Sequence, residues 1–193
     1  MNESKINRSR VFPFLLWGAA GLLLPSGCQS IETAEEDKTS RFFDLEGYFE
    51  QEKIRLRALD LSGVKTVRLN GEEETIELDS LPLENDFAIF LNSDINRRAW
   101  IDKYDGDTIY SAKGNLMAIR YQSNDPKLKV QSIEIQLEEE EVSSIQIERT
   151  MESLIAQTKQ ELSYNAGRDY QVASIQSSIM GDTTLTKVQL RIQ

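Results

Sequence analysis

Ser62 and Lys65 stand three residues apart, a spacing at which a lysine amine one helical turn away can activate a serine hydroxyl as a nucleophile. That chemistry requires both residues on one helix. Gly63 and Val64, which separate them, instead indicate a junction between a helix and a strand. The K-T-G and S-D-N motifs that accompany such a pair are also absent. We therefore interpret this match as chance and predict no catalytic residue.

Acidic residues gather in two places where they could hold a hard cation such as Ca²⁺, which takes oxygen ligands. One is the run of four glutamates at residues 138–141, and the other is Asp102, Asp105 and Asp107. Consecutive side chains on a strand or turn point in different directions, and the spacing of an EF-hand loop is missing. We interpret both groups as solvated turns and expect no metal site and no cofactor.

The residue inventory excludes several catalytic classes. The 193 residues include no His and one Cys, which removes Ser-His-Asp and Cys-His arrangements, the common zinc sites and any intrachain disulfide. The ten Gly form no dinucleotide or phosphate loop motif. Trp100, Tyr104 and Tyr110 could form an exposed ligand patch, although aromatic residues on strands usually belong to the core.

The start of the chain carries an export pattern. Residues 1–10 have three basic side chains and one acidic one, and residues 11–24 are an uncharged apolar stretch too short to span a membrane comfortably. Residues 25–28 read Pro-Ser-Gly-Cys. The pattern resembles the signal peptide of a bacterial lipoprotein, which implies cleavage before Cys28 and acylation of Cys28, for example with palmitate. A simple membrane anchor, or a signal peptide cut elsewhere, is the alternative.

Three segments follow from this interpretation: a signal peptide at 1–27, the lipidated Cys28 with a flexible acidic tether at 28–40, and one domain at 41–193. Without residues 1–27, the chain keeps 19 basic and 31 acidic residues, a net charge of −12. A field of that sign repels phosphate backbones, so we expect no nucleic-acid partner. The lipid must then hold the domain on the membrane, and we expect the domain to be monomeric.

The first helix is predicted within residues 41–61. Asp44 can cap its N-terminus, and acidic residues precede basic ones in the sense that the helix dipole favours. Glu52 interrupts an otherwise apolar stripe, and Gly63 ends the region.

A second helix is predicted to begin with Ser80 as its cap. Its apolar stripe consists of Leu83, Phe87, Phe90, Leu91 and Ile95. We expect this stripe to be buried against strands such as residues 128–137.

The rest of the domain reads as strands joined by short turns. Asn70-Gly71 predicts a hairpin whose register pairs Arg68 with Glu73. The other predicted strands are residues 100–104, 108–112, 116–121, 128–137, 142–149, 154–164, 170–179 and 185–192. Short turns dictate antiparallel pairing. The sequence therefore predicts an α+β domain: a roughly ten-stranded, largely sequential antiparallel sheet with two helices packed on one face.

One face of the sheet is predicted to be wet, because Ser144, Gln146, Glu148, Gln157 and Lys159 alternate with apolar residues. The layout resembles that of uncharacterised lipoproteins of Gram-negative envelopes, particularly Bacteroidota-like ones. Gln29 rather than Asp after Cys28 implies the outer membrane by the same resemblance.

Three functional hypotheses follow. The first is an envelope-anchored binding or structural module that recognises a protein or glycan in the periplasm or at the surface. The alternative is a carrier of a lipid or other apolar ligand, with a half-barrel fold like that of lipoprotein-sorting proteins. An enzyme that uses carboxylates alone is the third, and no pair of acids is singled out for it.

Overall fold

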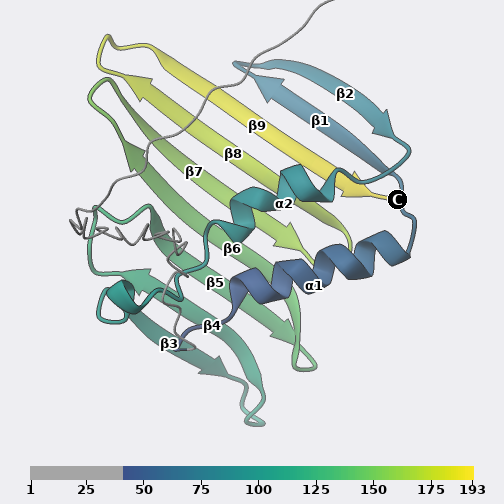
Figure 1. The fold of residues 1–193 in the computed structure, drawn as a ribbon, viewed down its shortest axis with the longest axis vertical. Helices are drawn as coiled ribbons and strands as arrows, with labels where there is room; N and C mark the ends of the chain where they lie inside the picture. The colour runs from purple at the N-terminus through teal and green to yellow at the C-terminus, as the bar shows by residue number, and fades with distance from the viewer. Residues whose placement is uncertain (1–40) are drawn as a thin grey trace, which may run out of the picture. The chain divides into compact units, whose positions relative to one another are not determined.

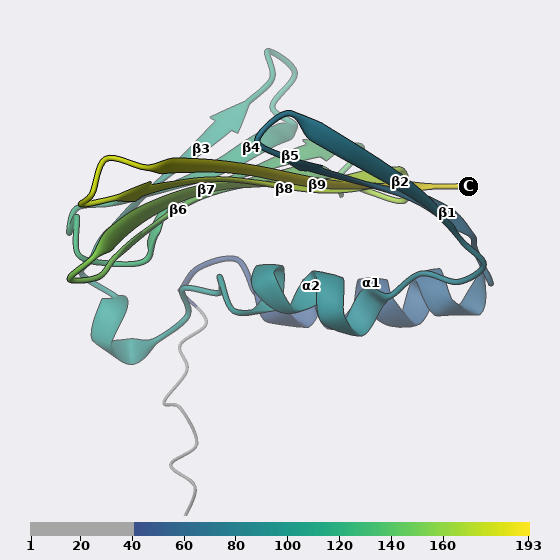
Figure 2. The same cartoon turned by 90° about the horizontal axis from the view of Figure 1, so that it is seen from above.

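The structure is a computed structural model that describes residues 41–193. They form a nine-stranded antiparallel sheet, and Figures 1 and 2 show two α-helices on its concave side. The helices are α1 (Leu45–Ala58) and α2 (Leu83–Leu91), with a short 3-10 helix η1 at Arg98–Trp100. The strands are β1 (Gly63–Leu69), β2 (Glu72–Leu78), β3 (Tyr104–Tyr110), β4 (Leu116–Ser123), β5 (Val130–Glu138), β6 (Glu141–Glu152), β7 (Ala156–Asn165), β8 (Asp169–Ser178) and β9 (Thr183–Ile192).

The strands from β3 to β9 lie side by side in chain order, and the β1–β2 hairpin joins the sheet through pairing of β1 with β9. The hairpin prediction is confirmed. Asn70 and Gly71 have φ of 49° and 96°, and Arg68 lies opposite Glu73 and forms an ion pair with it. Two-residue turns of this kind need positive φ at both positions, which Asn and Gly tolerate best.

The sheet has nine strands, whereas roughly ten were predicted. The segment predicted as a strand at residues 100–104 is instead the end of η1 and a turn, and β3 begins at Tyr104. Gly106, expected in a turn, lies within β3 opposite Tyr121. A Cβ at Gly106 would lie 3.2 Å from the Tyr121 ring. Glycine therefore serves close packing here, and β3 continues through Gly106 into the predicted strand at residues 108–112.

Helix α1 begins where the sequence predicts. The Asp44 carboxylate accepts a hydrogen bond of 2.8 Å from the Gly47 amide, which satisfies one of the free N–H groups of the first turn. Leu45, Phe49 and Leu56 of α1 are buried towards the sheet.

Helix α2 differs from its prediction at both ends. Its N-cap is Pro82 without a side-chain cap, so Ser80 does not cap it, and the helix ends at Leu91 before Ile95. The chain after α2 makes other hydrogen bonds: the Asn96 amide donates to Asp94 (2.7 Å), and the Asn96 side chain accepts from the Phe42 amide (3.0 Å). These contacts tie the end of α2 to the segment before α1, and Ile95 is buried outside the helix.

Aromatic rings fill the space between the helices and the sheet. Phe87 of α2 lies 5.5 Å from Tyr164 on β7 and 5.4 Å from Tyr170 on β8, measured between ring centroids. The rings of Phe49 and Phe90 are 4.8 Å apart. The aromatic contacts of α2 with the sheet are therefore with β7 and β8. Val130, Ile133 and Ile135 of the predicted strand at residues 128–137 belong to the same buried core as Phe87 and Phe90. The buried residues form one cluster whose members run from Phe42 to Leu190 in the sequence, so we expect residues 41–193 to fold as a unit.

The two faces of the sheet differ as predicted. Gln146, Glu148, Gln157 and Lys159 are exposed on the convex face, and Ser144 is half-buried. On the β1–β2 hairpin the apolar residues Leu69 and Ile76 are exposed. Both helices lie elsewhere on the concave side (Figure 1).

Candidate functional site

Cys28, the predicted site of lipidation, lies outside the described residues, as do the predicted signal peptide and tether. In the part of the chain from residue 41 onward, no helix is long and apolar enough to cross a membrane. The predictions for residues 1–40 therefore stay predictions.

The Ser62–Lys65 spacing does not place the two side chains on one helix. Ser62 precedes β1 and Lys65 lies within it. The Lys65 amine instead contacts both carboxylate oxygens of Asp86 on α2, at 2.8 and 2.9 Å, and Tyr170 donates its hydroxyl to the same carboxylate. This group joins α2 to β1 and β8, and its lysine is held by an ion pair.

The acidic groups are dispersed. Glu139 and Glu140 form the β5–β6 turn with φ of 52° and 69°, while Glu138 and Glu141 are opposite one another on the strands. Among residues 41–193, no three acidic or sulfur-bearing side chains gather closely enough to hold a metal ion. The alternative of an exposed aromatic patch is not borne out: Tyr104 is buried beside Trp100, with 6.4 Å between the ring centroids, whereas Tyr110 is 59% exposed.

A cleft of about 650 Å³ lies where the β7–β8 turn approaches α1. Glu52, only 6% exposed, is at its floor. Its carboxylate accepts hydrogen bonds from Arg55 Nε (2.7 Å) and Nη2 (2.6 Å) and from the Tyr164 hydroxyl, which in turn accepts from the Gly167 amide (3.2 Å). Gly167 has φ +65°, and an added Cβ would lie 3.2 Å from the Arg55 guanidinium.

The electrostatics of this cleft argue against acid–base catalysis. Burial raises the pKa of Glu52, but the hydrogen bonds from Arg55 and Tyr164 outweigh it and hold the pKa below its usual range. Burial and the bond to Glu52 raise the pKa of the Tyr164 hydroxyl. Neither group exchanges a proton near neutral pH, so the cluster serves to hold α1 on the sheet.

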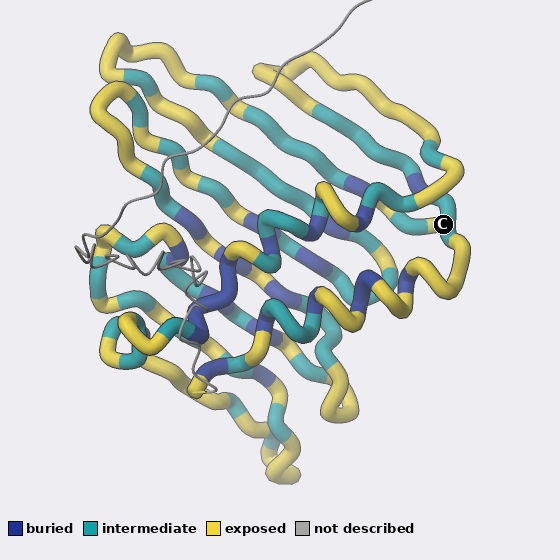
Figure 3. Tube along the Cα trace, viewed as in Figure 1, coloured by how far each residue is buried: buried dark blue, intermediate teal, exposed yellow. Residues whose placement is uncertain are grey.

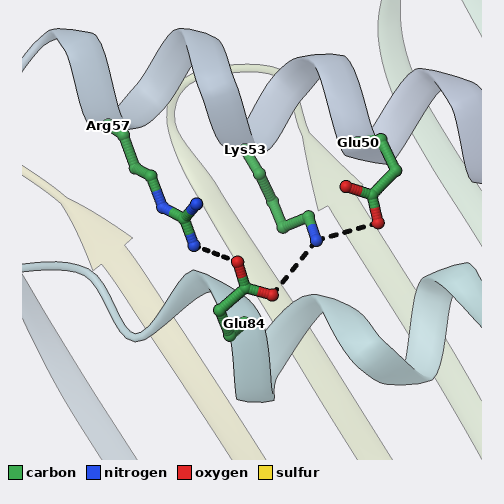
Figure 4. Close-up of polar contacts among 4 residues, drawn as sticks. All are labelled: Glu50, Lys53, Arg57 and Glu84. Carbon is green, nitrogen blue, oxygen red and sulfur yellow. Dashed lines mark hydrogen bonds and ion pairs between the residues drawn. The ribbon is translucent and has the colours of Figure 1, made fainter.

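A further set of ion pairs joins the two helices. Figure 4 shows the Glu84 carboxylate of α2 between Arg57 and Lys53 of α1, with Lys53 also reaching Glu50. The distances from Lys53 Nζ are 3.2 Å to Glu84 and 2.9 Å to Glu50. Every charge in this set has a partner, which indicates a structural role.

Within residues 41–193, Arg149 differs from the other buried charged side chains because its Nε has no hydrogen-bond partner. Arg149 on β6 is 9% exposed and makes no hydrogen bond or ion pair with any residue of 41–193; its Nε is buried without a partner. Gln160, directly opposite on β7, has an unpaired Oε1, while its Nε2 donates to the Ser174 hydroxyl (3.1 Å). Two unsatisfied polar groups thus lie side by side on neighbouring strands.

The β6–β7 and β8–β9 turns lie at one end of the sheet and are exposed (Figure 3), and large apolar side chains belong to them. We call this the apolar end: Leu154 (96% exposed), Ile155 (68%), Ile179 (74%) and Met180 (87%). The two turns are joined, because the Ile179 amide donates to the Ile155 carbonyl at 3.0 Å.

Sequence reasoning missed both the unpaired Arg149 and the apolar end, although each is indicated by a pattern in the sequence. Side chains on a strand alternate between its two faces, so Arg149 lies on the same face as Ile145 and Ile147, which is the apolar one. Leu154-Ile155 and Ile179-Met180 adjoin turn residues, where apolar pairs are unusual.

Comparison of the chain with family models, with curated proteins and with solved structures finds no match. Function must therefore be inferred from the residues themselves.

Proposed function

We propose that this chain is an envelope protein anchored by a lipid at Cys28, and that its domain is a binding module that contacts the lipid bilayer through the apolar end. The sequence pattern of residues 1–28 supports the anchor, and Gln29 supports the outer membrane by resemblance. The exposure of the four apolar side chains at adjacent turns carries the proposal for the domain.

The apolar end is a costly surface for a soluble domain. Each large apolar side chain removed fully from water contributes about 1.5–3 kcal/mol. Single exposed apolar residues are common, but a group gathered on two joined turns is typical of a contact with a protein or a membrane. Since both turns project from the strand ends, they can enter a flat surface without disturbing the sheet.

A bilayer is the occupant that fits the rest of the chain. The predicted tether, residues 29–40, spans at most about 40 Å when extended, so a domain anchored at Cys28 stays close to the bilayer surface. A net charge of −12 opposes binding to anionic head groups, so the contact must be apolar.

The test uses residues 41–193, without the lipid, and vesicles of phosphatidylcholine and phosphatidylethanolamine. We expect the domain to float with the vesicles, and binding to persist at high salt because no charge attraction is involved. Leu154→Ser with Met180→Ser should lower the partition coefficient at least tenfold, since each lost side chain contributes about 1 kcal/mol on partial burial.

The matched control is Ile54→Ser with Leu59→Ser, which removes two exposed apolar side chains from α1 and its C-cap. This control should bind as the unsubstituted domain does. Equal loss in both double variants, or binding that disappears in high salt, would contradict the bilayer contact. An envelope protein that binds the apolar end while vesicles do not would show that the partner is a protein.

The lipid-carrier alternative needs an apolar concave face that is left unfilled. Phe49, Phe87 and Phe90 occupy the concave side beneath the helices and pack against one another and the sheet. A large apolar ligand would have to displace both helices, so this packing supports the binding module over the carrier.

A further inference from the structure

We propose that Arg149, with Gln160 beside it, binds the oxyanion of an amphiphile, a carboxylate or phosphate group that carries an acyl chain. This inference goes beyond the proposed bilayer contact, and it rests on different residues.

The unpaired state of Arg149 is the first observation. A guanidinium carries five N–H donors, and the Nε of Arg149 is buried without a hydrogen-bond partner, while the residue as a whole is 9% exposed. Burial lowers the pKa of Arg149, and no neighbouring carboxylate counteracts this. Leaving a charge buried without a partner costs several kcal/mol, which a protein retains only where another group compensates it.

Gln160 adds a second unpaired group at the same place. Its side chain lies opposite Arg149, and the contact with Ser174 occupies only one end of its amide. Whichever way the amide is oriented, one of its two polar atoms is left unpaired. In the orientation in which Oε1 accepts from the Ser174 hydroxyl, Nε2 is free to donate to an ionised carboxylate or phosphate oxygen. An oxyanion held by Arg149 can then also bond to Gln160.

The surroundings favour an oxyanion that carries an apolar chain. On the same face, Ile147 precedes Arg149 and Met151 follows it, and Val130 lies opposite on β5. Ile147 and Val130 are buried, whereas Met151 is half-buried. Met151 also lies towards the end of β6 that leads to Leu154. A short acyl chain held at Arg149 would lie along Met151. Arg149 is four residues further along β6 than Ile145, which lies opposite Tyr164, so this position is outside the region that Phe87 fills. Free phosphate would gain nothing from the contact with Met151.

The test follows thermal unfolding of residues 41–193 with decanoate, below the concentration at which it forms micelles. Decanoate should raise the melting temperature, because a ligand that binds only the folded state stabilises it. Decan-1-ol, which has the same chain without the charge, should give no comparable rise, and neither should inorganic phosphate.

Arg149→Met should behave in two ways that together define the site. It should raise the melting temperature without ligand, because it removes an unpaired buried charge, and it should reduce the affinity for decanoate at least tenfold. Arg191→Met is the matched control: Arg191 lies exposed on β9, and its loss should leave decanoate binding within twofold of the unsubstituted domain.

Several outcomes would overturn the proposal. A lower melting temperature for Arg149→Met than for the unsubstituted domain would show that Arg149 already has a stabilising partner. An equal response to decanoate and decan-1-ol would mean that the charge plays no part. A response to phosphate with none to decanoate would exclude the amphiphile. Loss of vesicle binding in the Leu154 and Met180 variant has no bearing here, so failure of one proposal is distinguishable from failure of the other.

Discussion

The contact between Glu52 and Tyr164 offers a sharp test of what holds α1 on the sheet. Tyr164→Phe removes one hydroxyl that donates to the Glu52 carboxylate and accepts from the Gly167 amide. A hydrogen bond to a charged group is worth about 1.5–3 kcal/mol, and the aromatic packing is kept. We therefore expect a loss of about 2 kcal/mol in the free energy of unfolding.

Glu52→Gln keeps the shape of the side chain but gives up both charge-assisted contacts with Arg55. Arg55 is about half exposed, so water compensates for part of its loss. We expect a cost of about 2–4 kcal/mol. The double variant should cost less than the sum, with a coupling energy of about 1–2 kcal/mol from urea melts.

The pH dependence gives an independent check. The pKa of Glu52 is lower in the folded protein than its ordinary value of 4.5. Its ionisation therefore contributes stability that is present above about pH 4.5 and is lost as the pH falls through the lower, folded pKa. The difference in unfolding free energy between the unsubstituted domain and Glu52→Gln should shrink on going from pH 7 to pH 3.

The control for this series is Tyr48→Phe, in the same cleft. The Tyr48 hydroxyl has no hydrogen bond to the described residues, so its removal should cost less than about 0.5 kcal/mol. The reasoning is refuted if Tyr164→Phe is as neutral as Tyr48→Phe, or if the Glu52→Gln difference stays constant from pH 7 to pH 3.

Three other outcomes are expected. Phe90→Ala should lower the free energy of unfolding by about 3–5 kcal/mol in urea melts, because Phe90 is fully buried. Leu91→Ala, at a partly exposed position, should lower it by about 1–2 kcal/mol. Similar values for the two variants would mean that the buried face of α2 is wrongly assigned. Glu140→Gly should raise the urea midpoint by an amount equivalent to about 1 kcal/mol, because it relieves a positive φ, and a lower midpoint would refute this. Cys28→Ser in the full chain should abolish acylation, measured by incorporation of labelled palmitate, without changing the circular dichroism of the protein. Labelling that persists would exclude Cys28 as the acylated residue.

Much of the fold was predictable because local rules decide it. Asn70-Gly71 specifies the hairpin and its register through backbone conformation, and Asp44 marks the start of α1 through its capping bond. The alternation of polar and apolar residues likewise predicts the wet face. Where Gly106 was expected to break a strand, the reason for the glycine is the ring of Tyr121, a contact that strand pairing creates.

The candidate sites depended on contacts between distant residues. The sequence marks Glu52 as an interruption in an apolar stripe, but only the fold brings Tyr164 to it, 112 positions away in the chain. The phase of Arg149 places its charge on the inner face, yet whether a carboxylate would meet it there depended on how the helices and strands pack. Turns, caps and alternation depend on neighbours in sequence, so the sequence by itself determined them. The pairing of buried charges and the joining of two apolar turns depend on neighbours in space, which only the tertiary structure decided.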